Sequence, residues 1–381
     1  MNRKGAGRIA SGHPWVFSSD ILDRGGAEAG EAVTVTDPRG AALGTAHYSD
    51  ASLISLRMLS ERVEAIDRAF FRGRIAAAEE HRKRVVKDSE AYRLVHGEGD
   101  RLPGLVIDRY NDYFTLQTLD QGMERAKGEI VSVIEELFGP RGIVERNDVA
   151  IRKREALPLV AGVLAGDVPE TIGVRMNGLT MHADLLRGQK TGIFLDQREN
   201  YLAAAHYARG KALDCFTSSG GFALHLAARC ESVEAVDSAE ATLRTARMNS
   251  EANGIGNIEL READVFELLA GYAKAGRRFD MVVLDPPAFA KSRASVEAAR
   301  RGYGEINRRA LELLGPGGIL VTCSCSHHLS EAALLEIVAN ASLDTGRKLR
   351  VLERRMQAQD HPVLLTVPET LYLKCLILEV I

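Results

Sequence analysis

The sequence is poor in cysteine and contains no long apolar run. Five cysteines occur in 381 residues, and none of them shows the CxxC spacing that is typical of metal sites. Such an odd, sparse set argues against a disulfide framework and favours a reducing compartment. No segment approaches the roughly 20 uninterrupted apolar residues of a membrane-spanning helix, and the N-terminus is polar, unlike a signal peptide. We therefore expect a cytoplasmic protein with no metal and no membrane partner.

An excess of basic charge is lacking as well, because the formal net charge is -3. Many nucleic-acid-binding proteins are basic overall, although phosphate contacts require only one cationic face. The densest basic run comprises Arg72, Arg74, Arg82, Lys83, Arg84 and Lys87. Taken alone, this run is better explained as the solvent-exposed face of a helix than as a binding site.

The length and the residue pattern predict three domains. Short β-prone runs separated by turn residues predict a small β domain over residues 1–64. The pattern of residues 65–172 predicts an α+β module of the strand-strand-helix-strand type, preceded by a helix. The expected elements are a helix over 65–88, strands at 104–108 and 113–117, a helix over 123–137 and a strand at 142–145.

Residues 173–381 have a different pattern. After a hairpin (173–183) and a helix (197–209), helical stretches separate strands at 212–215, 233–237, 258–260, 281–285 and 319–323, and a last strand candidate spans 371–379. This alternation is typical of a parallel sheet wrapped by helices on both faces, so we expect an α/β, Rossmann-like fold.

Ligands of such sheets bind beyond the carboxyl ends of the strands, at the switch point. Here the first strand ends at Asp214 and continues into a turn of small residues that contains Phe216, Thr217, Gly220 and Gly221. The glycines allow the backbone to approach a ligand closely. We expect this turn and the Asp214 carboxylate to contact a cofactor.

Two further aspartates follow the next strands. Asp237 is placed to bind ribose hydroxyls, and Asp264, followed by Val265, is placed to accept from an adenine amino group. Each signal has a structural alternative, a plain turn or a helix N-cap. The G-x-G-x-x-G turn that would hold a pyrophosphate is missing, which disfavours a nicotinamide oxidoreductase. A cofactor with ribose and adenine but no pyrophosphate fits better, and S-adenosylmethionine is such a cofactor.

The fourth strand ends in Asp285-Pro286-Pro287-Ala288-Phe289. Two prolines fix the backbone there, so Asp285 is held rigidly and can accept from the exocyclic amine of a planar base. We expect Asp285 and Pro286 beside the cofactor, and Pro287 and Phe289 at the substrate. The alternative is a proline-terminated strand with a capping aspartate.

The fifth strand leads into Cys323-Ser324-Cys325. Cytosine C5 is a poor nucleophile, and a thiolate that adds to C6 activates it. Cys323 still lies in the strand and is expected to be a buried small hydrophobe. Cys325 lies in the loop and is the better nucleophile.

Several strings resemble the bacterial 23S ribosomal RNA cytosine-C5 methyltransferases of the RlmI/RlmO type, over nearly the whole chain. They are residues 12–17, 93–108, 188–200, 285–289 and 324–326, and the string 188–200 is highly specific. The resemblance implies an N-terminal RNA-binding PUA domain, a β-barrel, followed by the central module and a class I methyltransferase domain. It also implies that Cys325, rather than Cys323, is the nucleophile.

The resemblance implies further site residues. Phe194, Asp196 and Gln197 would lie near the cofactor or the substrate, with Lys190 at the substrate and Arg198 in support. His13 and Trp15 would touch the 23S RNA, although Trp15 could equally hold the barrel together. Many wider relatives carry a second cysteine after the motif-four prolines, where this chain has Ala288. The identity of the base that removes the C5 proton therefore stays open. Whether the protein forms a homodimer stays open as well.

Two other functions stay open. One keeps the cofactor and methylates an exocyclic amine of guanine or adenine, with Asp285 and Phe289 at the base and Cys325 idle. The other is a non-catalytic RNA-binding assembly factor, against which the intact set of aspartates and Cys325 argues.

Overall fold

The computed structural model describes residues 1–188, 190–290 and 295–381, so residue 189 of the string 188–200 lies outside the described residues. The chain divides into two compact units. Unit 1 comprises Met1–Gly178, Ala183–Leu195 and Gln359–Thr370, and unit 2 comprises Leu179–His182, Asp196–Ala358 and Leu371–Ile381.

Unit 1 begins with a four-stranded antiparallel sheet in the order β1-β4-β3-β2. Its strands are β1 (Trp15–Phe17), β2 (Ala32–Thr36), β3 (Ala42–Tyr48) and β4 (Ile54–Ser60). The helix α1 (Arg3–Ala10), which the sequence pattern did not predict, precedes them. It begins at Asn2, whose side-chain oxygen accepts a hydrogen bond from the Gly5 N–H. Alternate strand residues such as Val16, Val35 and Ala46 form a small core.

A second sheet of unit 1 has five strands in the order β5-β6-β7-β8-β9. They are β5 (Ala91–His96), β6 (Leu105–Tyr110), β7 (Tyr113–Thr118), β8 (Gly142–Asn147) and β9 (Val160–Gly166), with helices α2 (Arg68–Val85), α3 (Gln121–Arg125) and α4 (Lys127–Phe138). The sequence predicted the three middle strands and missed β5 and β9. The predicted single helix over 123–137 is wrong, because the structure has two helices there, with Ala126 between them.

The basic run lies along α2 and the residues that follow it, but its interpretation as a solvent-exposed face is wrong for Arg82. The Arg82 side chain is fully buried. Its Nη2 donates to Asp100 Oδ2 at 2.7 Å and to the Asp360 carbonyl oxygen at 2.7 Å. Arg72 pairs with Glu136 at 2.8 Å on the surface. Part of this positive charge therefore stabilises unit 1 itself.

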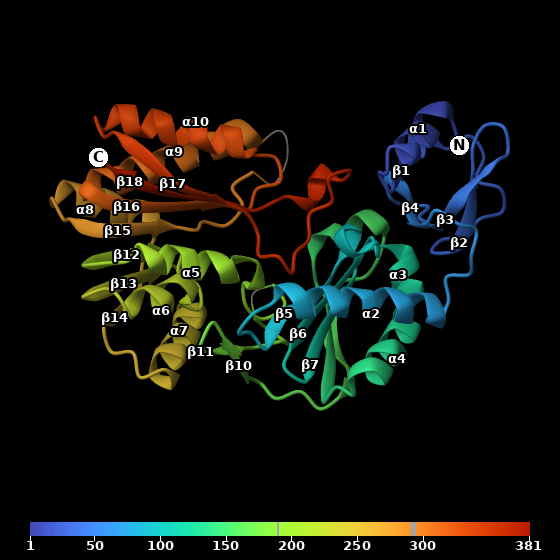
Figure 1. Ribbon diagram of the computed structural model, residues 1–381, viewed down its shortest axis with the longest axis horizontal. Coiled ribbons are helices and arrows are strands. Elements are labelled where there is room, and N and C mark those ends of the chain that lie inside the picture. Colours follow the sequence, from blue (N-terminus) through green and yellow to red (C-terminus); the bar gives the residue numbers. More distant parts are fainter. Residues whose placement is uncertain (189, 291–294) are drawn as a thin grey trace. The chain divides into compact units, whose positions relative to one another are not determined.

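Unit 2 contains a seven-stranded sheet in the order β14-β13-β12-β15-β16-β18-β17 (Figure 1). Its strands are β12 (Lys211–Cys215), β13 (Ser232–Asp237), β14 (Ile258–Glu262), β15 (Phe279–Leu284), β16 (Leu314–Ser324), β17 (Leu349–Arg355) and β18 (Lys374–Val380). The first five strands run parallel, as predicted, and β18 runs antiparallel to both of its neighbours. The strand order reverses between β12 and β15, which makes the carboxyl ends of these two strands the switch point.

Helices cover both faces of this sheet (Figure 1). They are α5 (Arg198–His206), α6 (Gly221–Ala227) and α7 (Glu240–Ala252) on one face, and α8 (Val265–Lys274), α9 (Val296–Leu313) and α10 (Glu331–Asp344) on the other. Buried side chains of α8, α9 and α10 form one core with the strands. The two short strands β10 (Ile172–Met176) and β11 (Leu179–Ala183) occupy the range that was predicted as a hairpin.

Among residues 1–188, 190–290 and 295–381, no helix is long and apolar enough to cross a membrane. In the same ranges, no group of three or more His, Cys, Asp or Glu side chains could hold a metal ion.

Candidate functional site

The loop after β12 is built around Asp214. This carboxyl is fully buried, and its Oδ2 accepts from Thr217 Oγ1 at 2.6 Å and from the Ala223 N–H at 3.0 Å. Within the described part of the chain, Oδ1 has no hydrogen-bond partner. Burial raises the pKa of Asp214 to about 7, against the opposing effect of these two hydrogen bonds. Asp214 therefore shapes the loop, and it occupies the Ala223 N–H in the first turn of the helix that follows.

The backbone of this loop takes the left-handed conformation at Phe216, Ser218 and Gly220, with φ of 64°, 51° and 86°. Gly221 is required for a different reason, because the Tyr201 ring lies against it. A Cβ on Gly221 would lie 2.9 Å from Tyr201 Cε1 and closer still to Cζ. Tyr201 itself is buried, with the Phe222 ring 4.8 Å away between ring centroids. The two glycines thus serve a tight turn and a close packing contact.

The aspartates after β13 and β14 both hold local backbone. Asp237 Oδ2 accepts from the Ser218 N–H at 2.9 Å, which ties the end of β13 to the first loop, and Oδ1 accepts from the Ala239 N–H at 3.0 Å. Asp264 is exposed and caps α8 by accepting from the Glu267 N–H at 3.0 Å. Both carboxylates remain at the carboxyl edge of the sheet, with one face toward solvent.

The loop after β15 carries Asp285, which is half-buried beside the buried Pro286. The Asp285 N–H donates to the Cys215 carbonyl oxygen at 3.4 Å, so it adjoins the end of β12 at the switch point. Pro287 is exposed. The Phe289 ring packs on Tyr303, with ring centroids 4.7 Å apart.

Cys325 differs from the other four cysteines because its side chain is half-buried, whereas theirs are buried. Cys323 lies inside β16, opposite Cys375 of β18. Burial raises the pKa of the Cys323 thiol well above its usual range, and the neighbouring Cys375 adds to the shift. The distinction that the sequence made between these two cysteines agrees with their burial.

Hydrogen bonds of its two neighbours hold Cys325 in place. Ser324 Oγ donates to the Tyr303 hydroxyl at 2.9 Å, and Ser326 Oγ lies 3.2 Å from the same hydroxyl. Ser326 Oγ also accepts from the Ala290 N–H at 3.3 Å. Both serines are fully buried, whereas the intervening Cys325 side chain is half-buried. The Ala290 bond joins the cysteine loop to the Asp285 loop.

A buried cation lies beside this cysteine. Lys374 of β18 is opposite Ser324 in the strand register, and its Nζ donates to the carbonyl oxygens of Ser326 and Tyr372, both at 2.7 Å. Within the described ranges no carboxylate lies within 4.0 Å of Nζ. Burial lowers the pKa of Lys374 to about 8, and an electrostatic interaction with Cys325 opposes that shift. Lys374 and Cys325 are therefore close enough to affect each other's charge.

Comparison with known proteins identifies the family. A model described as S-adenosylmethionine-dependent methyltransferase matches residues 146–376, and one described as a PUA-like domain matches residues 1–61. Ribosomal RNA large subunit methyltransferase I from Klebsiella pneumoniae subsp. pneumoniae is 40% identical over 95% of this chain and 93% of its own length. The same enzyme from Shewanella amazonensis is 43% identical over 97% and 95%. The chain belongs to this family.

Solved structures show the same fold as this member of the ribosomal RNA large subunit methyltransferase I family. SMU.776, described as a methyltransferase and crystallised with SAH, aligns with a TM-score of 0.86 at 21% identity over 99% of this chain and 98% of its own. A SAM-dependent methyltransferase from Streptococcus mutans aligns with a TM-score of 0.84, also at 21% identity. The predicted α/β fold, with a PUA-like domain before a class I methyltransferase domain, is confirmed, and so is S-adenosylmethionine as the cofactor.

The residues at the switch point fit this cofactor. Asp214 is a buried carboxyl whose Oδ1 has no hydrogen-bond partner among the described residues, and the loop that follows it has three residues in the left-handed conformation. Asp237 is half-buried at the next strand end. The contacts of Phe216, Thr217, Gly220, Val265 and Pro286 with the cofactor stay predictions, as do those of the aspartates.

The string 188–200 divides between the two units. In unit 2, Asp196 Oδ2 accepts from the Tyr372 hydroxyl at 2.7 Å, and Gln197 Oε1 accepts from Asn200 at 2.7 Å. Arg198 is buried in the same unit, with Nη2 3.6 Å from Glu199 Oε1. In unit 1, Lys190 Nζ lies 4.4 Å from the centre of the Phe194 ring. The structure thus places Asp196 in contact with the chain segment that leads to Lys374.

The two N-terminal candidates lie together in unit 1. His13 and Trp15 pack edge to face, with ring centroids 5.2 Å apart. Trp15 Nε1 donates to Glu98 Oε1 at 2.8 Å, and His13 Nε2 lies 3.3 Å from Glu369 Oε2. Trp15 therefore connects β1 with the residues after β5, and RNA contact by either side chain stays a prediction.

The sequence pattern predicted no role for Tyr201 or Tyr303, and it included Lys374 only in the last strand candidate, 371–379. Nothing in the pattern marks the two tyrosines, since each lies on a helix whose partners come from distant segments. Lys374 did leave a signal, because it is a charged residue directly before the apolar run Cys375–Leu378.

Proposed function

We propose that this protein methylates C5 of a cytosine in large-subunit (23S) ribosomal RNA, with Cys325 as the covalent nucleophile. The observation that carries the proposal is the Cys325 loop. It presents the one half-buried thiol of the chain from a loop that Ser324 and Ser326 anchor on Tyr303, and Ser326 binds the Asp285 loop through Ala290. The curated relatives act, by name, on large-subunit ribosomal RNA.

The reaction needs a thiolate near a base that is held in place. Attack of Cys325 Sγ on C6 forms a carbon–sulfur bond and makes C5 nucleophilic. S-adenosylmethionine, when bound, would supply the methyl group that C5 takes up, and S-adenosylhomocysteine would be the leaving group. A base then removes the C5 proton, and elimination breaks the bond between Sγ and C6 and restores the 5,6 double bond. In this proposal, Asp285 accepts a hydrogen bond from the exocyclic amine of the cytosine during these steps.

Lys374 is a positioning residue in this scheme. Its two bonds to backbone carbonyls hold Nζ beside the cysteine loop, and the protonated amine favours the thiolate form of Cys325. The neutral amine formed above about pH 8 would no longer do so.

Trapping on RNA that contains 5-fluorocytidine tests the nucleophile. Fluorine at C5 cannot leave as a proton does, so we expect a covalent adduct that survives denaturation with the wild type and with Cys323→Ser, and none with Cys325→Ala. Loss of adduct in Cys323→Ser alone would contradict the assignment. Methyl transfer that persists in Cys325→Ala would instead support methylation of an exocyclic amine, and binding of RNA without any turnover would support an assembly factor.

The PUA-like domain and the central sheet of unit 1 are proposed to hold the RNA by shape and phosphate contacts, while the catalytic unit takes a single-stranded or flipped cytosine. Bisulfite sequencing of ribosomal RNA from a deletion strain would identify the modified base. Formation of a homodimer stays a prediction.

A further inference from the structure

A hollow lined by basic residues lies on the methyltransferase unit, away from the loops described above. Its volume is about 550 Å³. It is formed by the C-terminal ends of α8 and α9, by Thr345 after α10 and by Arg347 before β17. Arg278 lines it immediately before β15. These positions lie where the parallel strands begin, whereas the cofactor loops follow their carboxyl ends.

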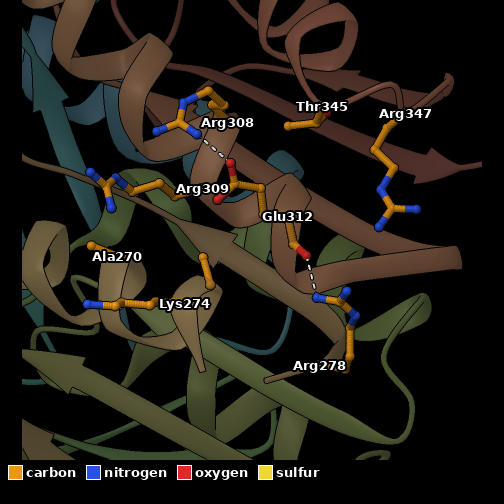
Figure 2. Close-up of a pocket in the computed structure, with 9 residues that line it drawn as sticks. Ala270, Lys274, Arg278, Arg308, Arg309, Glu312, Thr345 and Arg347 are labelled. Carbon is orange, nitrogen blue, oxygen red and sulfur yellow. Dashed lines mark hydrogen bonds and ion pairs between the residues drawn. The ribbon is translucent and has the colours of Figure 1, made fainter. Parts of the chain in front are cut away.

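The hollow concentrates positive charge in a chain whose net charge is -3. Five cations line it (Lys274, Arg278, Arg308, Arg309 and Arg347), and Glu312 is the one carboxylate among the lining residues. Figure 2 shows Glu312 between Arg308 and Arg278, with Arg347 on one side and Lys274 and Arg309 on the other. The cations therefore form an extended row rather than one compact cluster of positive charge.

Three of these cations have structural partners. Arg278 Nη1 donates to the Glu312 carbonyl oxygen at 2.6 Å, at the end of α9. Arg308 pairs with Glu312, and Arg309 Nε donates to Glu305 Oε1 at 2.6 Å. These hydrogen bonds and ion pairs are a sufficient structural reason for the three residues.

Lys274 and Arg347 are different. In the described part of the chain, neither the Lys274 amine nor the Arg347 guanidinium makes a hydrogen bond or an ion pair. They stand on opposite sides of Glu312 (Figure 2). The only apolar side chains in the lining are Ala270 and Ala273, and no aromatic side chain is present on which a base could stack. The hollow thus offers separated charges and no surface that would recognise a base.

We propose that this hollow binds the phosphodiester backbone of the RNA substrate, with Lys274 and Arg347 contacting successive phosphates. The inference rests on the proposed function only in taking RNA as the substrate. It extends the RNA-binding surface to the end of the sheet opposite the cofactor, and it predicts contacts that carry no sequence information. Glu312, at the centre of the row, disfavours a compact multiply charged anion.

The test measures RNA binding by the full-length protein as a function of salt, with a large-subunit ribosomal RNA fragment. Loss of two phosphate contacts lowers the slope of log K against log salt by about 1.4, since each contact to a single strand contributes about 0.7. We expect this change in Lys274→Gln/Arg347→Gln, together with a roughly three- to tenfold loss of affinity near 0.15 M salt. The double variant Arg244→Gln/Arg247→Gln removes the same charge from exposed positions of α7 and should change neither value.

Equal slopes of log K against log salt for Lys274→Gln/Arg347→Gln and Arg244→Gln/Arg247→Gln would overturn the proposal. The proposal would also be overturned if inorganic phosphate displaced the RNA as effectively, per phosphate group, as unlabelled RNA does, because the site would then bind a small anion. An unchanged affinity for S-adenosylmethionine shows that the variants are folded. If the wild type binds RNA through the hollow but forms no 5-fluorocytidine adduct, the cytosine-C5 mechanism fails while this inference stands.

Discussion

Asp214→Asn should change the pH dependence of stability of the methyltransferase unit. The ordinary carboxyl pKa of 3.8 is raised to about 7 by burial in the folded protein. Between these two values the folded state holds a proton that the unfolded state has lost, so folding is destabilised as the pH rises through this window. The Asn side chain does not titrate and lacks this dependence.

The magnitude follows from the two pKa values. At about 1.4 kcal/mol per pKa unit, the penalty of the buried carboxyl is about 2 kcal/mol at pH 5 and about 4 kcal/mol at pH 8. The Asn Nδ2 would take the place of Oδ1, which has no partner among the described residues, at a pH-independent cost of about 1–3 kcal/mol. The free energy of unfolding of Asp214→Asn relative to wild type should therefore rise by about 2–3 kcal/mol from pH 5 to pH 8.

Calorimetry and far-UV circular dichroism across this pH range, without cofactor, measure the difference. Tryptophan fluorescence is unsuitable, because the single tryptophan, Trp15, lies in unit 1. Thr217→Val is the matched control, since it removes a hydrogen bond to Asp214 but keeps the carboxyl. A stability difference between Asp214→Asn and wild type that stays constant within about 0.5 kcal/mol from pH 5 to pH 8 would refute the reasoning.

Two further predictions concern the site. Lys374→Met should raise the apparent pKa of the acid limb of the single-turnover rate by about one unit, because the thiolate loses its neighbouring cation. Lys374→Arg should keep this apparent pKa near the wild-type value. Identical pH profiles for the wild type and both variants would exclude an effect of Lys374 on the Cys325 thiolate. Gly221→Ala should destabilise the protein by about 1–3 kcal/mol through overlap with the Tyr201 ring. Adding Tyr201→Leu should recover part of that loss in urea unfolding, and strictly additive effects of the two substitutions would contradict the contact.

Local pattern predicted the parallel part of the unit 2 sheet and the loops that follow its strands. The reason is that alternating apolar strands and helices leave a strong periodic signal, and parallel strands place their carboxyl ends along one edge. The separation of Cys323 from Cys325 was also accessible, because a two-residue difference moves a side chain from strand to loop.

Other features depend on partners that are distant in sequence. Strand β9 is largely exposed and contains small residues, so it lacks the apolar alternation of a predicted strand. In the sequence, Arg82 resembles any surface arginine of a helix, because its hydrogen-bond partners Asp100 and Asp360 are distant in the chain. The placement of Lys374 beside Cys325 follows from the antiparallel pairing of β16 with β18, which no local pattern encodes.

The position of β18 has a consequence for the order in which the sheet is assembled. It lies between β16 and β17 but follows both of them in the chain. During synthesis, β16 therefore keeps an unpaired edge until residues 374–380 emerge, and β17 has no strand partner in this sheet before then. Such an edge is a site for pairing with other chains. The strand that closes it also delivers Lys374, so the thiol receives its cation only in the last step that completes the sheet.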